Sequence, residues 1–295
     1  MFDISTNIEN ILYLISASIF IIGLKQLSSP KTARNGNRFS AIGMLIAIIA
    51  TTLKYTEINI EWIILGLIIG ATIGSILAKY VKMTAMPQLV ALFNAFGGAA
   101  SGLVAMYEVL YSKETNTEIF ILASVAFATI VGAITLTGSF IAFGKLQGII
   151  TTKPVLIPIR NVINLIIAIA ILTIAVMLCV TETDASNYLY ALVALSLLFG
   201  ILIVMPIGGA DMPVVVALLN SYSGIAGAGA GFVLGNPLLI IAGSLVGASG
   251  LILTRIMTKA MNRSLVNVML GGFGAESTNS SSNNTGDRPV KSLSS

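Results

Sequence analysis

The feature that most limits the fold of this chain is a series of apolar stretches, each close to the length of a membrane-spanning helix. A spanning helix needs about 20 mostly apolar residues. Such stretches are common here because 56% of the 295 residues are hydrophobic and only 9% are charged, against roughly 25% charged residues in soluble domains. The nine stretches are 8–24, 39–53, 61–78, 87–110, 119–144, 161–180, 187–206, 213–233 and 236–257. They predict an all-α, polytopic membrane helix bundle with about nine transmembrane helices, of which the short second helix tilts or extends into its flanks.

The charges between these stretches predict an orientation, because cytoplasmic loops are enriched in Lys and Arg. With nine spans, all of the 16 basic residues except Lys54 and Lys113 fall on one side. All but three of the 12 acidic residues fall on the other side. The basic loops carry Lys25, Lys31, Arg34, Arg38, Lys79, Lys82, Lys145, Lys153, Arg160 and Arg255. We therefore expect the N-terminus outside and the C-terminus in the cytoplasm.

Several kinds of chemistry are excluded by residues that the sequence lacks. It contains no histidine, the commonest proton carrier near neutral pH. Its single cysteine, Cys179, can form neither a disulfide framework nor a cysteine metal site. There is no P-loop, no glycine-rich dinucleotide fingerprint after a strand and no cluster of metal ligands. We therefore predict no metal site, no nucleic-acid partner and no catalytic site for covalent chemistry within this chain.

A repeated motif links two of the predicted helices. "MPQLVALFN" at 86–94 is followed by "MPVVVALLN" at 212–220, and both copies begin helices that run in the same direction. Each is followed by a returning helix with a Gly/Ser/Thr patch, "GAITLTGS" at 132–139 and "GSLVGASG" at 243–250. The repeat predicts a parallel duplicated hairpin, made of helices 4–5 and 8–9, like the parallel repeats of some transporters.

Each copy of the motif ends on an asparagine, Asn94 or Asn220, which lies about 10 Å into the membrane at 1.5 Å of rise per residue. Asn94 shares a helical face with two small residues, and Asn220 shares one with Ser223 and Gly227. Polar groups inside membranes often mark pathways, so we expect these faces to line a narrow, hydrated path. The alternative is that they only pack helices together. The small-residue runs 66–74 and 224–231 are interpreted as packing surfaces of that kind.

Charged residues frame the second copy at its predicted cytoplasmic end. Asp211 directly precedes Met212-Pro213, where we expect it to cap the helix and favour its positive dipole. Arg255, Lys259 and Arg263 follow a spacing of four residues, which predicts one basic helical face. This face is either a positive-inside anchor or a docking surface for a soluble domain or an anionic group.

These stretches closely resemble the beta subunit of the proton-translocating NAD(P) transhydrogenases, and the likeness covers roughly residues 8–274. The matching stretches are "MPQLVALFNAFGG" (86–98), "TGSFIAFGKL" (137–146), "GGADMPVVVALLNSYSG" (208–224), "GSLVGASG" (243–250), "KAMNRS" (259–264) and "GGFG" (271–274). The resemblance implies a membrane proton channel that is coupled to hydride transfer between NADH and NADP+. It implies that NADP(H) and NAD(H) are bound by domains or subunits outside this chain.

The resemblance also implies roles for individual residues. It implies that Asn220 lies on the proton path and that Ser139 and Ser249 are polar positions of the channel helices. With Asn94 and Ser223, these residues make up the expected path. The resemblance implies that Asp211, Lys259 and Arg263 lie at the cytoplasmic rim, where they couple the channel to the NADP(H)-binding domain.

The expected partners are an alpha subunit with an NAD(H) site and membrane helices, an NADP(H)-binding domain, a second protomer and the lipid bilayer. The expected location is the bacterial inner membrane. Residues 1–274 are expected to form the transmembrane proton-conducting domain and residues 275–295 a disordered polar linker. Because the family's subunit normally continues into an NADP(H)-binding domain, we expect this chain to be a fragment, half of a split subunit or a degraded remnant.

One position departs from the family pattern, because some members have a histidine where this chain has Asn94. Asparagine cannot titrate, so the protonatable group comes from a partner's helix, or water held by the two amides carries the proton. Two other functions are compatible with the residues alone. One is a secondary transporter or channel for a small solute, and the other is a structural membrane scaffold.

Overall fold

The computed structural model describes residues 4–54, 60–111, 118–156, 158–181 and 185–270, which form helices joined by short connections. Nine helices of this described part are long and apolar enough to cross a membrane, which confirms the predicted fold class. The helices are α1 (Ile4–Leu27), α2 (Ala33–Lys54), α3 (Ile60–Tyr80), η1 (Met83–Ala85), α4 (Met86–Tyr111), α5 (Ile119–Leu146), α6 (Arg160–Val180), α7 (Ala185–Val204), η2 (Gly209–Asp211), α8 (Met212–Val233), α9 (Pro237–Ala260) and α10 (Leu265–Leu270). The predicted linker at 275–295 lies outside the described residues.

Most helix bounds agree with the apolar stretches to within a few residues, because the apolar length sets where a spanning helix starts and ends. The main difference is in α2, which begins at Ala33, so that the polar residues 33–38 form its first turns. This is the extension into the flanks that its short apolar stretch allowed. The turn between α8 and α9 is as tight as predicted, with Gly235 at φ +57° and the Asn236 side chain capping α9.

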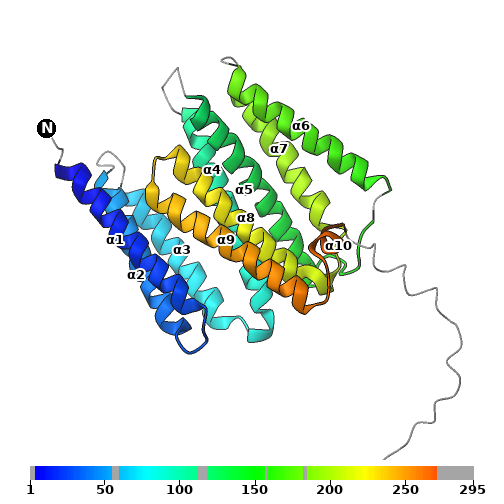
Figure 1. The fold of residues 1–295 in the computed structure, drawn as a ribbon, viewed down its shortest axis with the longest axis horizontal. Helices are drawn as coiled ribbons and strands as arrows, with labels where there is room; N and C mark the ends of the chain where they lie inside the picture. Colours follow the sequence, from blue (N-terminus) through cyan, green and yellow to red (C-terminus); the bar gives the residue numbers. More distant parts are fainter. Residues whose placement is uncertain (1–3, 55–59, 112–117, 157, 182–184, 271–295) are drawn as a thin grey trace, which may run out of the picture.

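The helices form three groups along the long axis of the molecule (Figure 1). The hairpin of α1 and α2 lies at one end with α3, and α6 and α7 lie at the other end. The two repeated hairpins, α4–α5 and α8–α9, occupy the middle. Helix α8 packs against α4, α5 and α9, and most of its residues are buried as a result. The second copy of the repeat therefore forms the centre of the bundle.

Each repeated hairpin is held by the same close contact between glycine backbones. A Cβ atom at Gly132 of α5 would lie 2.6 Å from the carbonyl oxygen of Gly98 on α4. A Cβ atom at Gly243 of α9 would lie 2.6 Å from the carbonyl oxygen of Gly224 on α8. Gly98 and Gly224 occupy the same position in the two copies of the motif. The duplication seen in the sequence is therefore matched by equal packing of the two hairpins.

Helices α4 and α8 meet along a local twofold axis. A Cβ atom at Gly97 would lie 3.0 Å from Ser223 Oγ, and one at Gly227 would lie 3.8 Å from Ser101 Oγ. In the repeat, Ser223 is the counterpart of Gly97, and Gly227 is the counterpart of Ser101. Each residue thus faces its own counterpart, which requires two parallel helices related by an axis along their length.

The two small-residue runs behave differently. The run 224–231 packs closely as predicted, and a Cβ atom at Gly231 would lie 2.7 Å from the backbone nitrogen of Ile240. The run 66–74 has no such packing contact within the described part of the chain. Helix α3 has no buried residue, and no described atom lies within 4 Å of a Cβ added at Gly66, Gly70 or Gly74.

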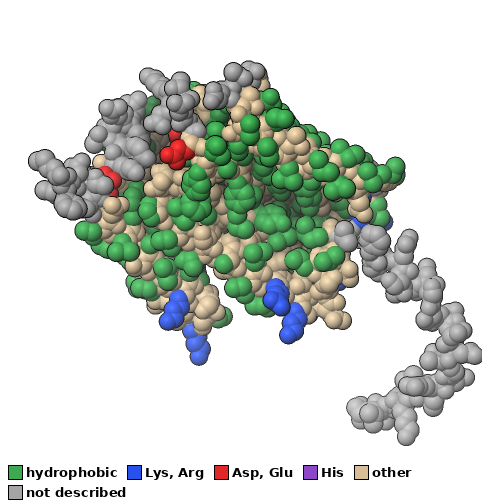
Figure 2. All heavy atoms as spheres, turned by 45° about the horizontal axis from the view of Figure 1, so that its top comes forward, with side chains coloured by type: hydrophobic (Ala, Val, Ile, Leu, Met, Phe, Trp, Pro, Cys, Tyr) green, Lys and Arg blue, Asp and Glu red, His purple; other side chains and the backbone are tan. Residues whose placement is uncertain are grey.

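Charged side chains gather at the two ends of the bundle. In Figure 2, Lys and Arg side chains lie at one end and Asp and Glu side chains at the opposite end. We call the first the basic end, where α1, α3, α5, α7 and α9 finish. Most of the cations predicted for loops lie near helix ends instead, and Lys145 differs from the others in being buried. It occupies the last turn of α5 with none of its surface exposed.

We predict opposite effects for two Gly→Ala substitutions in the middle of helices. Gly132→Ala should lower the free energy of unfolding by about 1–3 kcal/mol, because the methyl group overpacks the contact with Gly98. Gly70→Ala should leave it unchanged or raise it by up to about 1 kcal/mol, because alanine favours the helix and meets no neighbour. Thermal unfolding of the purified protein in detergent measures both. An equal loss of stability in the two variants would contradict the packing described for α4 and α5.

Candidate functional site

The predicted path residues Asn94 and Ser139 lie together in the bundle. Asn94 is on α4, two turns after Pro87, and only 6% of its surface is exposed. Its Nδ2 donates a hydrogen bond to Ser139 Oγ of α5 at 2.8 Å, and Ser139 is itself buried. The glycine contact of α4 with α5 brings the two helices close enough for this short pair. The side-chain amide of Asn94 keeps a second N–H and its carbonyl oxygen for other partners.

Asn220 occupies the same position in the second copy but has a different environment. It is half-buried, and its side chain forms no hydrogen bond with the described part of the chain. The reason is the alignment of the two return helices, α5 and α9. When Gly132 of α5 is aligned with Gly243 of α9, Gly250 occupies the position that corresponds to Ser139. Gly250 provides no hydroxyl group. The Asn220 amide therefore keeps its full hydrogen-bonding capacity for water or for a group from outside this chain.

Two predicted path residues lie elsewhere on these helices. Ser249 is exposed on α9, and its hydroxyl group donates to the carbonyl oxygen of Val246 at 2.9 Å. The structure does not bring it together with Asn220, because Gly250 takes the inward position and each helical residue is turned about 100° from the next. Ser223 is half-buried and faces Gly97 across the local twofold axis.

The predicted gate residues Asp211 and Arg263 approach one another at the basic end. Asp211 lies at the N-terminus of α8, but its side chain accepts no capping hydrogen bond, so that prediction was wrong. Arg263 Nε lies 3.9 Å from Asp211 Oδ1 instead. This distance is too long for a hydrogen bond, and the buried Oδ1 has no hydrogen-bond donor in the described part of the chain. The pair is thus a loose electrostatic contact between the start of α8 and the segment after α9.

Arg263 does not continue the basic face of α9, which was also predicted wrongly. Helix α9 ends at Ala260, and Asn262 adopts the left-handed conformation with φ +53°. The backbone N–H of Arg263 then donates to the carbonyl oxygen of Thr258 at 2.9 Å, which closes the helix end. The chain therefore turns back toward α8 and carries Arg263 to Asp211, while Lys259 and Arg255 stay exposed on α9.

Two further polar side chains form hydrogen bonds at the basic end that the sequence analysis did not predict. Gln88 Nε2 of α4 donates to the carbonyl oxygen of Leu146 at 3.1 Å. Lys145 Nζ donates to the carbonyl oxygens of Met205 and Ile207, the latter at 2.7 Å. A signal for Lys145 exists in the sequence, because it continues the apolar run of α5 rather than a polar loop.

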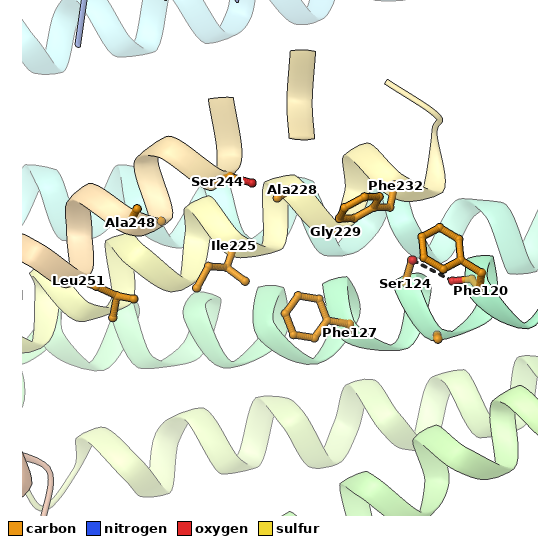
Figure 3. Close-up of a pocket in the computed structure, with 12 residues that line it drawn as sticks. Phe120, Ser124, Phe127, Ile225, Ala228, Gly229, Phe232, Ser244, Ala248 and Leu251 are labelled. Atoms are coloured by element: carbon orange, nitrogen blue, oxygen red, sulfur yellow. Dashed lines mark hydrogen bonds between the residues drawn. The ribbon is translucent and has the colours of Figure 1, made fainter. Parts of the chain in front are cut away.

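A pocket of about 560 Å³ lies between α5, α8 and α9. Figure 3 shows the rings of Phe120, Phe127 and Phe232 around it, and the Ser124 hydroxyl group donates to the carbonyl oxygen of Phe120. Its lining is mainly apolar and contains no titratable side chain. The pocket therefore offers no group that could exchange a proton.

We predict that the Asn94–Ser139 hydrogen bond stabilises the folded bundle. In a double-mutant cycle with Asn94→Ala and Ser139→Ala, the coupling energy should be about 0.5–1.5 kcal/mol, as for hydrogen bonds between membrane helices. Unfolding in detergent measures each variant. Asn220→Ala combined with Ser139→Ala is the matched control, and it should show a coupling energy near zero.

Comparison with known proteins identifies the family. The model of the family "NAD(P) transhydrogenase beta subunit" matches residues 9–295. The NAD(P) transhydrogenase subunit beta of Rhodospirillum rubrum is 46% identical over 286 residues, which cover 95% of this chain and 61% of that relative. A second sequence of this subunit, from a specified strain of the same species, matches equally well. This similarity does not favour the solute-transporter alternative. The chain belongs to the family of NAD(P) transhydrogenase beta subunits.

Proposed function

We propose that residues 1–274 form the membrane, proton-conducting domain of a proton-translocating NAD(P) transhydrogenase. In this enzyme, proton movement across the membrane is coupled to hydride transfer between NADH and NADP+. Family membership and the nine apolar helices support the proposal. The proposed partners are an alpha subunit with an NAD(H) site, an NADP(H)-binding domain and a second protomer. The proposed location is the bacterial inner membrane, with the basic end in the cytoplasm.

The observation that supports the proton path best is the pair of asparagines at equivalent positions of the repeat. Asn94 is held by Ser139, whereas Asn220 has no partner among the described residues. Polar side chains inside membrane helices are costly and often line pathways. An amide cannot titrate, but its N–H and carbonyl groups can hold water in place. Protons then pass along water held by Asn94 and Asn220, or reach a titratable group on a partner's helix.

The proposed gate consists of Asp211, Lys259 and Arg263 at the basic end. The Asp211–Arg263 contact is loose, and the exposed Lys259 and Arg263 are free to meet a soluble domain. A long ion pair of this kind is weak in itself, so a docking surface can rearrange it at little cost. We propose that the nucleotide state of the NADP(H)-binding domain opens or closes the path through this contact.

The described residues do not fit a nucleotide, so hydride transfer is assigned to domains outside this chain. The described part contains no strand that leads into a glycine-rich loop, which a dinucleotide fold would require. Gly208 and Gly209 precede α8, but the N–H of Gly209 already donates to the carbonyl oxygen of Thr152 at 2.8 Å. We therefore propose that the described part of this chain acts on the proton and not on the nucleotide.

Asn220→Leu tests the proposed path in the assembled enzyme. The leucine has the same number and branching of side-chain heavy atoms but no hydrogen-bonding group. Proton uptake coupled to hydride transfer should therefore fall by about tenfold or more, because at least one hydrogen-bonded step is lost. Asn161→Leu is the matched control, because it makes the same change at an exposed position of α6 and should leave the rate unchanged. Proton uptake by membrane vesicles and nucleotide turnover are measured together. Unchanged coupling in Asn220→Leu would remove the role given to this residue.

A further inference from the structure

Lys145, in the last turn of α5, is the only charged side chain in the described part of the chain that is fully buried. Its Nζ donates hydrogen bonds to the backbone carbonyl oxygens of Met205 and Ile207. No carboxylate of the described residues pairs with it, because the one ion pair among them joins Arg263 and Asp211. Backbone carbonyl groups alone hold the buried charge.

The ends of two helices explain why this arrangement is stable. Lys145 lies at the C-terminal end of α5, and Met205 directly follows the last residue of α7. The C-terminal end of a helix carries a partial negative charge and carbonyl groups without intrahelical partners. The ammonium group therefore lies near the C-terminal ends of α5 and α7, which carry partial negative charge. It binds the carbonyl oxygens of Met205 and Ile207, which follow α7. Charge-assisted hydrogen bonds of this kind are stronger than neutral ones.

The segment that Lys145 binds leads directly to the proposed gate. Residues 205–208 connect α7 with η2, whose last residue is Asp211. Two backbone hydrogen bonds also hold the connection, from Gly209 N–H to Thr152 O at 2.8 Å and from Val155 N–H to Met205 O at 3.3 Å. Lys145 is the side chain that holds the same connection from within the bundle. Ile207 also lies in the buried apolar core together with Ala142 of α5, so Lys145 adds the polar contact between this segment and α5.

The same helix also carries the partner of the buried asparagine. Ser139 lies six residues before Lys145, about 9 Å along the axis of α5, and it accepts the hydrogen bond from Asn94. One helix thus contacts the proposed path through Ser139 and the segment before the gate through Lys145. A rigid helix that contacts both sites can transmit a shift from one to the other.

We propose that Lys145 is a positioning residue of the coupling mechanism. Its ammonium group fixes the segment 205–208 to the end of α5, holds Asp211 opposite Arg263, and ties the gate to the helix that carries Ser139. This inference rests on the proposed function, in which Asp211 belongs to the gate. It assigns Lys145 no contact with a nucleotide and no proton transfer of its own.

A labelling experiment in the assembled complex tests whether Lys145 holds this segment. Cys179→Ser removes the only thiol of this chain, and Gly208→Cys places a reporter on a half-buried residue of the segment, where a Cβ atom would meet only ordinary contacts with Pro154. Lys145→Met keeps a long side chain but removes the charge and the donors. We expect a maleimide to react about threefold faster or more with the reporter in this variant, because the segment opens locally once its inner hydrogen bonds are lost.

Lys79→Met is the matched control for labelling, because it removes an exposed lysine from the same end of the bundle and should leave the rate unchanged. An equal labelling rate with and without Lys145 would overturn the positioning role. If Lys145→Met fails to accumulate, Lys145→Gln takes its place, since the shorter neutral amide cannot reproduce the two contacts. Lys145→Gln should show the same increase in labelling rate, and an unchanged rate in this variant would also overturn the positioning role.

A double-mutant cycle separates positioning from general stability. We expect Lys145→Met to lower proton-coupled hydride transfer by about tenfold or more, and the double variant with Asp211→Asn to be no slower than Asp211→Asn alone, because residues that act through one contact are not additive. Multiplied losses in the double variant would show that Lys145 acts independently of Asp211 and would overturn the inference. Labelling needs no enzyme activity. If the unmodified complex shows no proton-coupled hydride transfer, the proposed function is overturned. The labelling rates would still decide whether Lys145 holds the segment 205–208.

Discussion

The contact between glycine backbones within each repeated hairpin is the constraint on which the rest of this bundle depends. Lipid provides little hydrophobic drive between helices, so close packing of small residues has to hold them together. At Gly98–Gly132 and Gly224–Gly243 the backbones approach so closely that an added methyl group would overlap a carbonyl oxygen. These contacts set the register of each hairpin. The register then determines that the Asn94 side chain bonds a serine, whereas the Asn220 side chain has no hydrogen-bond partner among the described residues.

The basic end has a different organisation, in which backbone carbonyl groups accept most of the hydrogen bonds between the segments. The connections 147–156 and 205–211 bind one another through their backbones. Lys145 ties the end of α5 to the second connection, and Gln88 ties the start of α4 to Leu146 at the end of α5. The ion pair of Asp211 and Arg263 lies on top of this framework and is the loosest contact in it. This arrangement is compatible with the proposed gate, because the weak ion pair can change while the backbone hydrogen bonds around it stay in place.

Sequence alone was enough for the spans and the repeat, because the length of an apolar stretch and the position of Met-Pro are local signals. The features that the sequence did not predict depend on tertiary contacts, which no local sequence pattern indicates. Ser249 does not lie beside Asn220, because one residue of helical rotation turns it outward and leaves Gly250 inside. Arg263 was kept on the α9 face, because the left-handed Asn262 that ends the helix cannot be read from spacing. Lys145 was taken for a loop charge, since its carbonyl partners lie on a distant segment.

The local twofold axis between α4 and α8 places each residue opposite its own counterpart, which is how two identical subunits meet in a symmetric dimer. Two identical chains would have to oppose glycine with glycine and serine with serine at such an axis. Here Gly97 of α4 lies opposite Ser223 of α8, and one turn further Ser101 of α4 lies opposite Gly227 of α8. Joining both copies in one chain thus let a larger and a smaller side chain alternate across the axis, a fit that a homodimer of a single hairpin could not reach.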